Sequence, residues 1–238
     1  MRQRLKNIYL QLRNDHPRIG ALLFRIRNGG LMRRIKINGP KQAVKVSIAP
    51  SCVIKNLRIY ISGGNHKVII GPEAIINDVN ILLKNRSNTL LIGSGVRFNK
   101  GGSIVFEDND GSITIGESST FENVHLAVTG NCKSIKIGQG CMFAYDIDVR
   151  TGDSHAVLDV EGNKINHEKD VVFGSHVWVA AHVTILKGVT IGANSIVATR
   201  STVTKSFGGE NLLIGGSPAQ ILKTEINWCR DRYPNGAA

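Results

Sequence analysis

Residues Phe173 to Ser206 read FGSHVW VAAHVT ILKGVT IGANSI VATRST VTKS when the chain is divided into sixes. Every block opens with an apolar residue, and the fifth place of each complete block is small or β-branched. The openings are Phe173, Val179, Ile185, Ile191, Val197 and Val203, and the fifth places are Val177, Val183, Val189, Ser195 and Ser201. A helix repeats its apolar residues every three to four positions and a strand every two, so a period of six fits neither. The period predicts a three-sided solenoid with coils of about eighteen residues, whose opening residues point to the axis.

This repeat resembles that of the hexapeptide-repeat acyltransferases, and the resemblance covers roughly residues 45–232. It implies an all-β protein, a left-handed parallel β-helix. We expect the β-helix over residues 45–217, after a basic, helical N-terminal segment at 1–44. Residues 218–238 are expected to form a C-terminal helix and tail, because Pro218 suits the first turn of a helix.

A looser form of the repeat precedes the six blocks. Isoleucines spaced by 22 or 23 residues open successive coils, and a small or β-branched residue stands four places after each. The isoleucines are Ile48, Ile70, Ile92, Ile115 and Ile137. Turn-forming tetrads account for the extra residues of each coil, and they begin at Gly63, Asn85, Asp108 and Gly130. One corner of the prism should therefore bulge, while Cys52 and Cys141 fall in the core-lining column and not at a catalytic position.

A long insertion interrupts this pattern at residues 151–170, TGDSHAVLDVEGNKINHEKD. A long excursion at one solenoid corner is where function is expected. The segment Thr151–His155, followed by Asp159 and later by Trp178, resembles O-acetyltransferases of sugars and capsular polysaccharides. The resemblance implies that His155 is the catalytic base.

The chemistry agrees with that role, because a sugar hydroxyl attacks a thioester well only as its proton is removed. Histidine side chains titrate near neutral pH, at about 6.5, and can take that proton. A carboxylate near the imidazole would orient it. The sequence does not choose among four candidates, and we name Asp153 with His155 as the predicted catalytic residues. The candidates are Asp146, Asp148, Asp153 and Asp159.

The same resemblance implies an acetyl-CoA site and no metal. Its predicted residues are Trp178, which would line the donor channel, and Ala181, Thr199, Thr204, Lys205 and Pro218, which would contact the donor. Ala180 and Arg200 stand where glycine is common in the family. His176 and His182 occupy fourth places near corners, where surface or subunit contacts are expected. A zinc site built by histidines across a subunit interface, as in carbonic-anhydrase-like β-helices, is the alternative.

The charge is concentrated in the N-terminal segment. The chain has a net charge of +12, and residues 1–45 hold twelve Lys/Arg against one acid. Apolar residues at helical spacing predict two short amphipathic helices, around Leu5–Leu12 and Ile19–Ile26. They would cap the solenoid with a solvated basic face, or attract an anionic polymer or a membrane surface. No motif supports nucleic-acid binding.

Length and composition favour one reduced, cytoplasmic solenoid domain, with peripheral contact at the inner membrane face as an option. The chain has 238 residues and four cysteines, none in a CxxC pair. It has no apolar run of membrane-spanning length, and no apolar core follows its basic start, so neither a membrane span nor a signal peptide is predicted.

The expected function is acetyl-CoA-dependent O-acetylation of a carbohydrate hydroxyl, most simply on a bacterial capsule or lipopolysaccharide. Transfer would be direct, at the subunit interface of a homotrimer. The alternatives are N-acetylation of an amino sugar and a non-catalytic β-helix scaffold that binds a polyanion or membrane.

Overall fold

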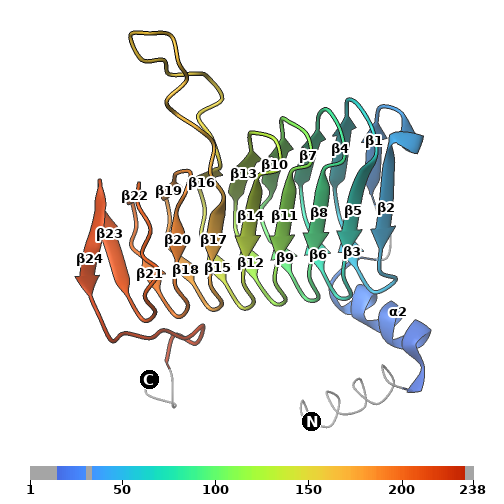
Figure 1. The fold of residues 1–238 in the computed structure, drawn as a ribbon. Coiled ribbons are helices and arrows are strands. Elements are labelled where there is room, and N and C mark those ends of the chain that lie inside the picture. Colours follow the sequence, from blue (N-terminus) through green and yellow to red (C-terminus); the bar gives the residue numbers. More distant parts are fainter. Residues whose placement is uncertain (1–14, 31–33, 234–238) are drawn as a thin grey trace.

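The computed structural model describes residues 15–30 and 34–233. Its chain winds through three parallel β-sheets, A, B and C, that form the sides of a prism (Figure 1). Each coil before the last contributes one strand to each sheet in that order, so strands adjacent in a sheet come from successive coils. The three-sided solenoid predicted from the six-residue period is confirmed.

Sheet A contains β1 (Ile35–Asn38), β4 (Leu57–Ile61), β7 (Val79–Leu83), β10 (Gly102–Phe106), β13 (Val124–Val128), β16 (Ile147–Arg150), β19 (Thr184–Ile185) and β22 (Thr202–Val203). Sheet B contains β2 (Val44–Ile48), β5 (His66–Ile70), β8 (Thr89–Ile92), β11 (Ser112–Ile115), β14 (Ser134–Ile137), β17 (Val171–Phe173) and β20 (Thr190–Ile191). Sheet C contains β3 (Val53–Ile54), β6 (Ile75–Ile76), β9 (Arg97–Phe98), β12 (Thr120–Phe121), β15 (Met142–Phe143), β18 (Trp178–Val179), β21 (Ile196–Val197), β23 (Leu213–Gly216) and β24 (Ala219–Lys223). Helix α2 (Pro17–Arg27) precedes the sheets, and the 3-10 helix η1 (Lys41–Ala43) lies between β1 and β2.

The core is a narrow column of side chains along the prism axis. All six predicted opening residues are 2% exposed or less, and all five fifth-place residues are 1% exposed or less. Cys52 and Cys141 are fully buried in the same column, as predicted. The rings of Phe98 and Phe121 stack at 4.6 Å between centroids, and those of Phe121 and Phe143 at 4.9 Å. Register is therefore fixed by like residues stacking on like from coil to coil.

The fourth place of each block forms a corner of the prism. These residues have a positive φ: 57° at His176, 59° at His182, 79° at Gly188, 57° at Asn194 and 57° at Arg200. Left-handed backbone turns the chain sharply, and it is rare for residues other than Gly, Asn, Asp and His. The fourth-place histidines thus have a structural reason for their position.

The corner between sheets A and B is wide in the first coils, as the 22-residue spacing predicts. Asn88 lies fully buried in this corner and links two successive coils. Its amide donates to the carbonyls of Lys84 (2.7 Å) and Asp108 (2.9 Å), and its oxygen accepts from the Gly111 amide (2.8 Å). The insertion at 151–170 leaves the prism at the same corner, between β16 and β17, and stands away from the body in Figure 1.

Helix α2 lies against the outer face of sheet C near the first coils. Phe24 is 9% exposed and packs with the outward side chains of Val53 and Ile75. The parallel ladder starts with β1 at Ile35, ten residues before the boundary expected from the sequence, because Ile35 pairs with Leu57. The first predicted helix, around Leu5–Leu12, lies outside the described residues.

The C-terminal helix predicted to start near Pro218 is wrong. Residues Ala219–Lys223 form β24, which pairs antiparallel with β23 at the end of sheet C. Gly216, at φ 105°, allows the reversal that brings the chain back along β23. The last coil would otherwise leave a row of unpaired backbone groups, and β24 supplies partners for them.

Candidate active site

The insertion at 151–170 forms a hairpin-like arm. Leu158 and Lys164 make an antiparallel bridge, and the Ile165 amide donates to the Val157 carbonyl at 2.9 Å. At the tip, the Asp159 carboxylate accepts from the amides of Glu161 (3.0 Å) and Asn163 (2.8 Å), bonds that lower the pKa of its carboxyl. The arm therefore has its own backbone ladder and a capped turn.

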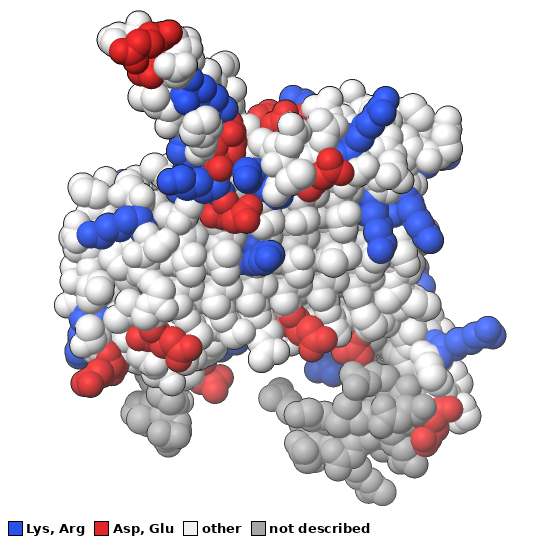
Figure 2. All heavy atoms as spheres, in the orientation of Figure 1, with Lys and Arg blue, Asp and Glu red and all other residues white. Residues whose placement is uncertain are grey.

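The root of the arm is anchored to the prism. The Thr151 hydroxyl is fully buried; it donates to the Thr129 carbonyl and accepts from the Thr129 amide, both at 2.8 Å. Lys187, on the next coil, forms an ion pair with the Asp153 carboxylate and donates to the Asn166 carbonyl at 2.9 Å. Figure 2 shows acidic residues at the tip of the arm and a mixed cluster of acidic and basic residues at its root. The start of the arm, where His155 lies, is thus held in place.

His155 presents its imidazole to solvent. Its backbone amide donates to the Asp153 carbonyl (2.8 Å), and its carbonyl accepts from the Asn166 amide group (2.8 Å). The residue is exposed, and within the described chain its ring has no hydrogen-bond partner. The backbone is fixed on both sides while the ring remains free to meet a substrate or a neighbouring subunit.

The four candidate carboxylates all have other partners within this chain. Asp146 accepts from His182 at 2.6 Å, and Asp148 pairs with Arg150 at 2.7 Å. Asp159 builds the tip of the arm. Asp153 pairs with Lys187 and accepts from Asn166 at 2.8 Å, and the bond from Lys187 contributes most to lowering the pKa of its carboxyl. The predicted contact between Asp153 and the His155 ring is absent from the described part of the chain, because Lys187 holds that carboxylate.

Trp178 lies on the opposite side of the prism from the arm. The corner between sheets A and B, which carries the arm, faces sheet C across a three-sided prism, and Trp178 points outward from β18 of sheet C. Ala181 follows at the corner between sheets C and A, where its carbonyl accepts from the Thr199 hydroxyl at 2.8 Å. The structure thus brings Trp178, Ala181 and Thr199 to one region and places His155 of the same chain elsewhere.

The other predicted donor contacts are exposed on two different corners. Thr204 and Lys205 follow β22, at the corner that carries the arm, and Pro218 follows β23 of sheet C. The Lys205 ammonium group bonds to the Gln220 side chain at 2.9 Å. Thr204, Lys205 and Pro218 form one site with Trp178 only if the donor spans the end of the prism or if a second subunit contributes residues to the site.

The C-terminal segment at 226–233 crosses the outer face of sheet C, which the sequence did not predict. Trp228 is 8% exposed; its ring stacks on that of His176 at 4.1 Å between centroids, and its indole N–H donates to the His176 carbonyl at 2.8 Å. The Trp178 and Trp228 ring centroids are 6.0 Å apart. The one available signal was that Trp228 is one of only two tryptophans in the chain.

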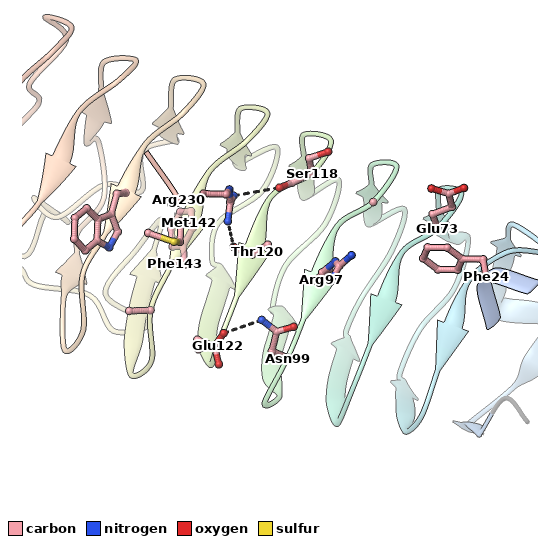
Figure 3. Close-up of a pocket in the computed structure, with 13 residues that line it drawn as sticks. Phe24, Glu73, Arg97, Asn99, Ser118, Thr120, Glu122, Met142, Phe143 and Arg230 are labelled. Atoms are coloured by element: carbon pink, nitrogen blue, oxygen red, sulfur yellow. Dashed lines mark hydrogen bonds between the residues drawn. The ribbon is translucent and has the colours of Figure 1, made fainter. Parts of the chain in front are cut away.

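Between this segment and α2 runs an open groove of about 710 Å³ on sheet C (Figure 3). Outward side chains of successive coils line its floor: Arg97, Thr120, Met142 and Trp178. Arg230 lies over the middle of this floor (Figure 3), where its guanidinium donates to the Thr120 hydroxyl (2.8 Å) and to backbone carbonyls. The groove therefore begins at the tryptophan assigned to the donor channel.

Within residues 15–30 and 34–233, no group of three or more His, Cys, Asp or Glu side chains is arranged to hold a metal ion. His176 stacks on Trp228. His182 pairs with Asp146 and packs edge-to-face on the Tyr145 ring, with 5.0 Å between ring centroids. Both histidines therefore have partners within one chain.

Among residues 15–30 and 34–233, no helix has the length and apolar character of a membrane span.

A β-helix of hexapeptide coils with a histidine-bearing arm at one corner and a tryptophan-lined groove opposite defines a hexapeptide-repeat transferase. The chain belongs to the hexapeptide-repeat acetyltransferase family. The family model described as "Bacterial transferase hexapeptide (six repeats)" matches residues 170–205. The crystal structure of the polysialic acid O-acetyltransferase OatWY is 33% identical, covers 86% of this chain and 94% of its own, and has a TM-score of 0.72. The crystal structure of the polySia-specific acetyltransferase NeuO is 27% identical in sequence, covers 83% of this chain and 89% of its own, and has a TM-score of 0.73.

Among curated proteins, the polysialic acid O-acetyltransferase of Neisseria meningitidis is 36% identical over 126 residues, 52% of this chain and 58% of the relative. This chain spans about half the length of the curated relatives it matches. The solved neighbours are left-handed β-helix acetyltransferases, and the predicted fold class is confirmed.

Proposed function

We propose that this protein is an acetyl-CoA-dependent O-acetyltransferase that acts on a carbohydrate hydroxyl of a bacterial surface polysaccharide. The observation that carries the proposal is the position of His155: it is exposed, at the root of an anchored arm, on a β-helix whose relatives are named polysialic acid O-acetyltransferases. An exposed imidazole on a fixed backbone can reach a substrate hydroxyl without breaking any internal bond.

In the proposed reaction, His155 takes the proton of the sugar hydroxyl as its oxygen attacks the thioester carbonyl of acetyl-CoA. The tetrahedral intermediate then collapses and the C–S bond breaks. The thiolate of coenzyme A leaves and accepts the proton from the imidazolium. The products are the sugar ester and free coenzyme A, and no covalent enzyme intermediate is formed.

A complete site requires a second copy of the chain. His155 and Trp178 lie on opposite sides of one prism, so the arm of one subunit has to meet the groove face of another. The arm also presents apolar side chains to solvent: Val157 is 51% exposed, Leu158 54%, Val160 99% and Ile165 58%. Exposed apolar side chains on a protruding element mark an interaction surface. A closed homotrimer, in which the arm of each subunit contacts the groove face of the next, satisfies this requirement.

Incubation with acetyl-CoA and a sialic acid oligomer tests the proposal. Free coenzyme A should appear in proportion to acetylated oligomer, and mild base should release the acetyl group, since esters are cleaved by mild base and amides are not. A base-stable product would indicate N-acetylation. Absence of transfer to any of a panel of acidic and neutral glycans would contradict the proposal and favour a scaffold.

A further inference from the structure

The groove on sheet C extends well beyond Trp178, and the reaction described above uses only its Trp178 end. Its floor is one outward column of the sheet, since Thr120 is the register partner of both Arg97 and Met142, and Met142 pairs with Trp178. Neighbouring strands of a sheet are about 4.8 Å apart, so the four side chains rise in even steps along the prism axis. Such a track suits an extended, repetitive ligand better than a compact one.

Two guanidinium groups lie over neighbouring coils of this track (Figure 3). Arg230 donates to the Thr120 hydroxyl at 2.8 Å and to the carbonyls of Cys141 (2.8 Å), Gly140 (3.1 Å) and Ser118 (3.2 Å). Arg97 projects from the neighbouring coil, as Figure 3 shows. Partial burial lowers the pKa of Arg230, and the nearby charge of Arg97 adds to this effect.

Neither guanidinium is neutralised within the described part of the chain. The bonds of Arg230 all go to neutral oxygens, and Arg97 is exposed without an ion-pair partner. Two carboxylates also line the groove (Figure 3): Glu73 lies beside Phe24 at the α2 end, and Glu122 is engaged by the Asn99 amide at 2.7 Å and the Lys100 ammonium group at 3.5 Å. Two like charges held next to one another favour an anion that lies between them. A carboxylate fits best, because the planar fork of arginine matches its two oxygens.

The remaining lining has the chemistry of a sugar site. The indole of Trp178 and the thioether of Met142 offer apolar surface to the C–H face of a ring. Asn99 and Ser118 line one side of the groove with further polar side chains for hydroxyl groups. We propose that the sheet C groove binds acidic sugar units of the acceptor chain, with Arg97 and Arg230 holding a sugar carboxylate and the reacting unit placed at the Trp178 end. This inference rests on the proposed function, and it assigns where the acceptor polymer lies.

The test measures binding of a sialic acid hexamer by calorimetry in the absence of any donor, so that catalysis plays no part. The comparison ligand is the same hexamer with its carboxyl groups reduced to alcohols. Arg97→Ala is the test variant. Arg58→Ala is the matched control, because Arg58 is also an exposed, outward-facing strand residue, but on sheet A. Both variants remove one positive charge from the same prism.

Loss of a charge-assisted hydrogen bond should weaken binding of the carboxylated hexamer by about tenfold in Arg97→Ala. Binding of the reduced hexamer should change by less than twofold, as should both affinities in Arg58→Ala. The KM for acetyl-CoA should stay unchanged in Arg97→Ala, which separates a sugar carboxylate from a donor phosphate as the bound anion.

Equal affinities of wild type and Arg97→Ala for the carboxylated hexamer would overturn the inference, as would equal losses in the two arginine variants or for the two ligands. A raised KM for acetyl-CoA in Arg97→Ala would reassign the groove to the donor. If the wild-type protein binds the hexamer through Arg97 but never acetylates it, the inferred binding of acidic sugars in the groove is retained and only the proposed function is contradicted.

Discussion

The Lys187 ammonium group pairs with the Asp153 carboxylate and so ties the root of the 151–170 arm to the following coil. Asn166, on the returning limb of the arm, donates to the same carboxylate at 2.8 Å. One acidic side chain therefore fastens both limbs of the arm to the prism. Asp153 holds the segment that carries His155 and does not bond to its ring, so it acts on His155 through the backbone.

Replacement of Lys187 by Met should raise the pKa of the Asp153 carboxyl toward the ordinary aspartate value of about 3.9, because the largest cause of its lowering is removed. NMR titration of the Asp153 side-chain carbon measures this directly. A carboxyl whose pKa is lowered by folding contributes stability above its unfolded pKa, and that contribution is lost as the pH falls through the lower, folded pKa. Acid loosening of the arm should thus begin at a higher pH in Lys187→Met than in wild type.

Lys169→Met is the control for this experiment, because Lys169 lies at the returning end of the arm, next to Gly188, and its replacement removes the same charge. It should leave the Asp153 titration near that of wild type. An unchanged Asp153 titration in Lys187→Met would show that the ion pair does not hold the arm in solution.

Val189→Lys should abolish cooperative folding. Val189 is fully buried in the fifth-place column, where a charged side chain would have to enter the packed axis. A loss of roughly 4 kcal/mol or more in the free energy of unfolding is expected. Thr190→Lys, one residue on, places the same side chain on the outer face of β20 and should keep the melting temperature within a few degrees. Similar melting temperatures for the two variants would contradict the hexad phase.

The fold was predictable because the period of six is local and repeated in every coil. The wide corner and the position of the arm could also be predicted, because both appear as extra residues relative to a coil of about eighteen residues. The end of the chain was not predictable in this way. Pro218 is compatible with the start of a helix, and the pairing of β24 with β23 depends on the unpaired strand that the last coil leaves behind.

The residues of the candidate site could be named from the sequence, but their contacts could not. The position of His155 followed from the motif in the insertion. The partner of Asp153 lies 34 residues away, and the carbonyl bonded by Trp228 lies 52 residues away. Such contacts are decided by the stacking of coils, which no local pattern specifies. The hexad phase predicts that Arg97 points outward from sheet C. It does not predict that the C-terminal segment places Arg230 over the same face.

Trp228→Phe should turn Trp178 into a single fluorescent reporter of the donor site, because the chain has only two tryptophans. Acetyl-CoA should change its emission in a saturable manner if Trp178 lines the donor channel. In the complementary variant, Trp178→Phe, the remaining Trp228 is buried against His176 and should respond much less. A response confined to Trp228 would remove Trp178 from the donor site.

Helix α2 should bring the protein to anionic membrane surfaces. Its packed side holds Phe24, while Ile19, Leu22 and Ile26 remain 48%, 48% and 50% exposed beside several arginines. Basic helices with an exposed apolar face bind the interface of anionic bilayers. Leu22→Ser with Ile26→Ser should lower binding to phosphatidylserine-containing vesicles by about tenfold in sedimentation assays, since burial of the exposed half of each side chain is worth roughly 0.8 kcal/mol.

The matched control for the membrane prediction is the double variant Ile221→Ser with Leu222→Ser. These residues of β24 are 50% and 60% exposed, and their loss should leave vesicle binding unchanged. Binding of the wild type should also weaken in 1 M salt, where the Debye length is about 3 Å. Equal vesicle binding by all three proteins would assign α2 to packing on sheet C alone.

The most direct test of the whole account is the acetyl transfer rate of His155→Ala. His167→Ala is its control, because His167 is an exposed histidine of the same arm. We expect His155→Ala to keep the melting temperature and oligomeric state of wild type but to transfer acetyl groups about 10²–10⁴-fold more slowly, as loss of a general base requires. His167→Ala should stay within a few fold of wild type. A His155→Ala protein that transfers at a near-normal rate would contradict the assignment of His155 as the base, and with it the central claim.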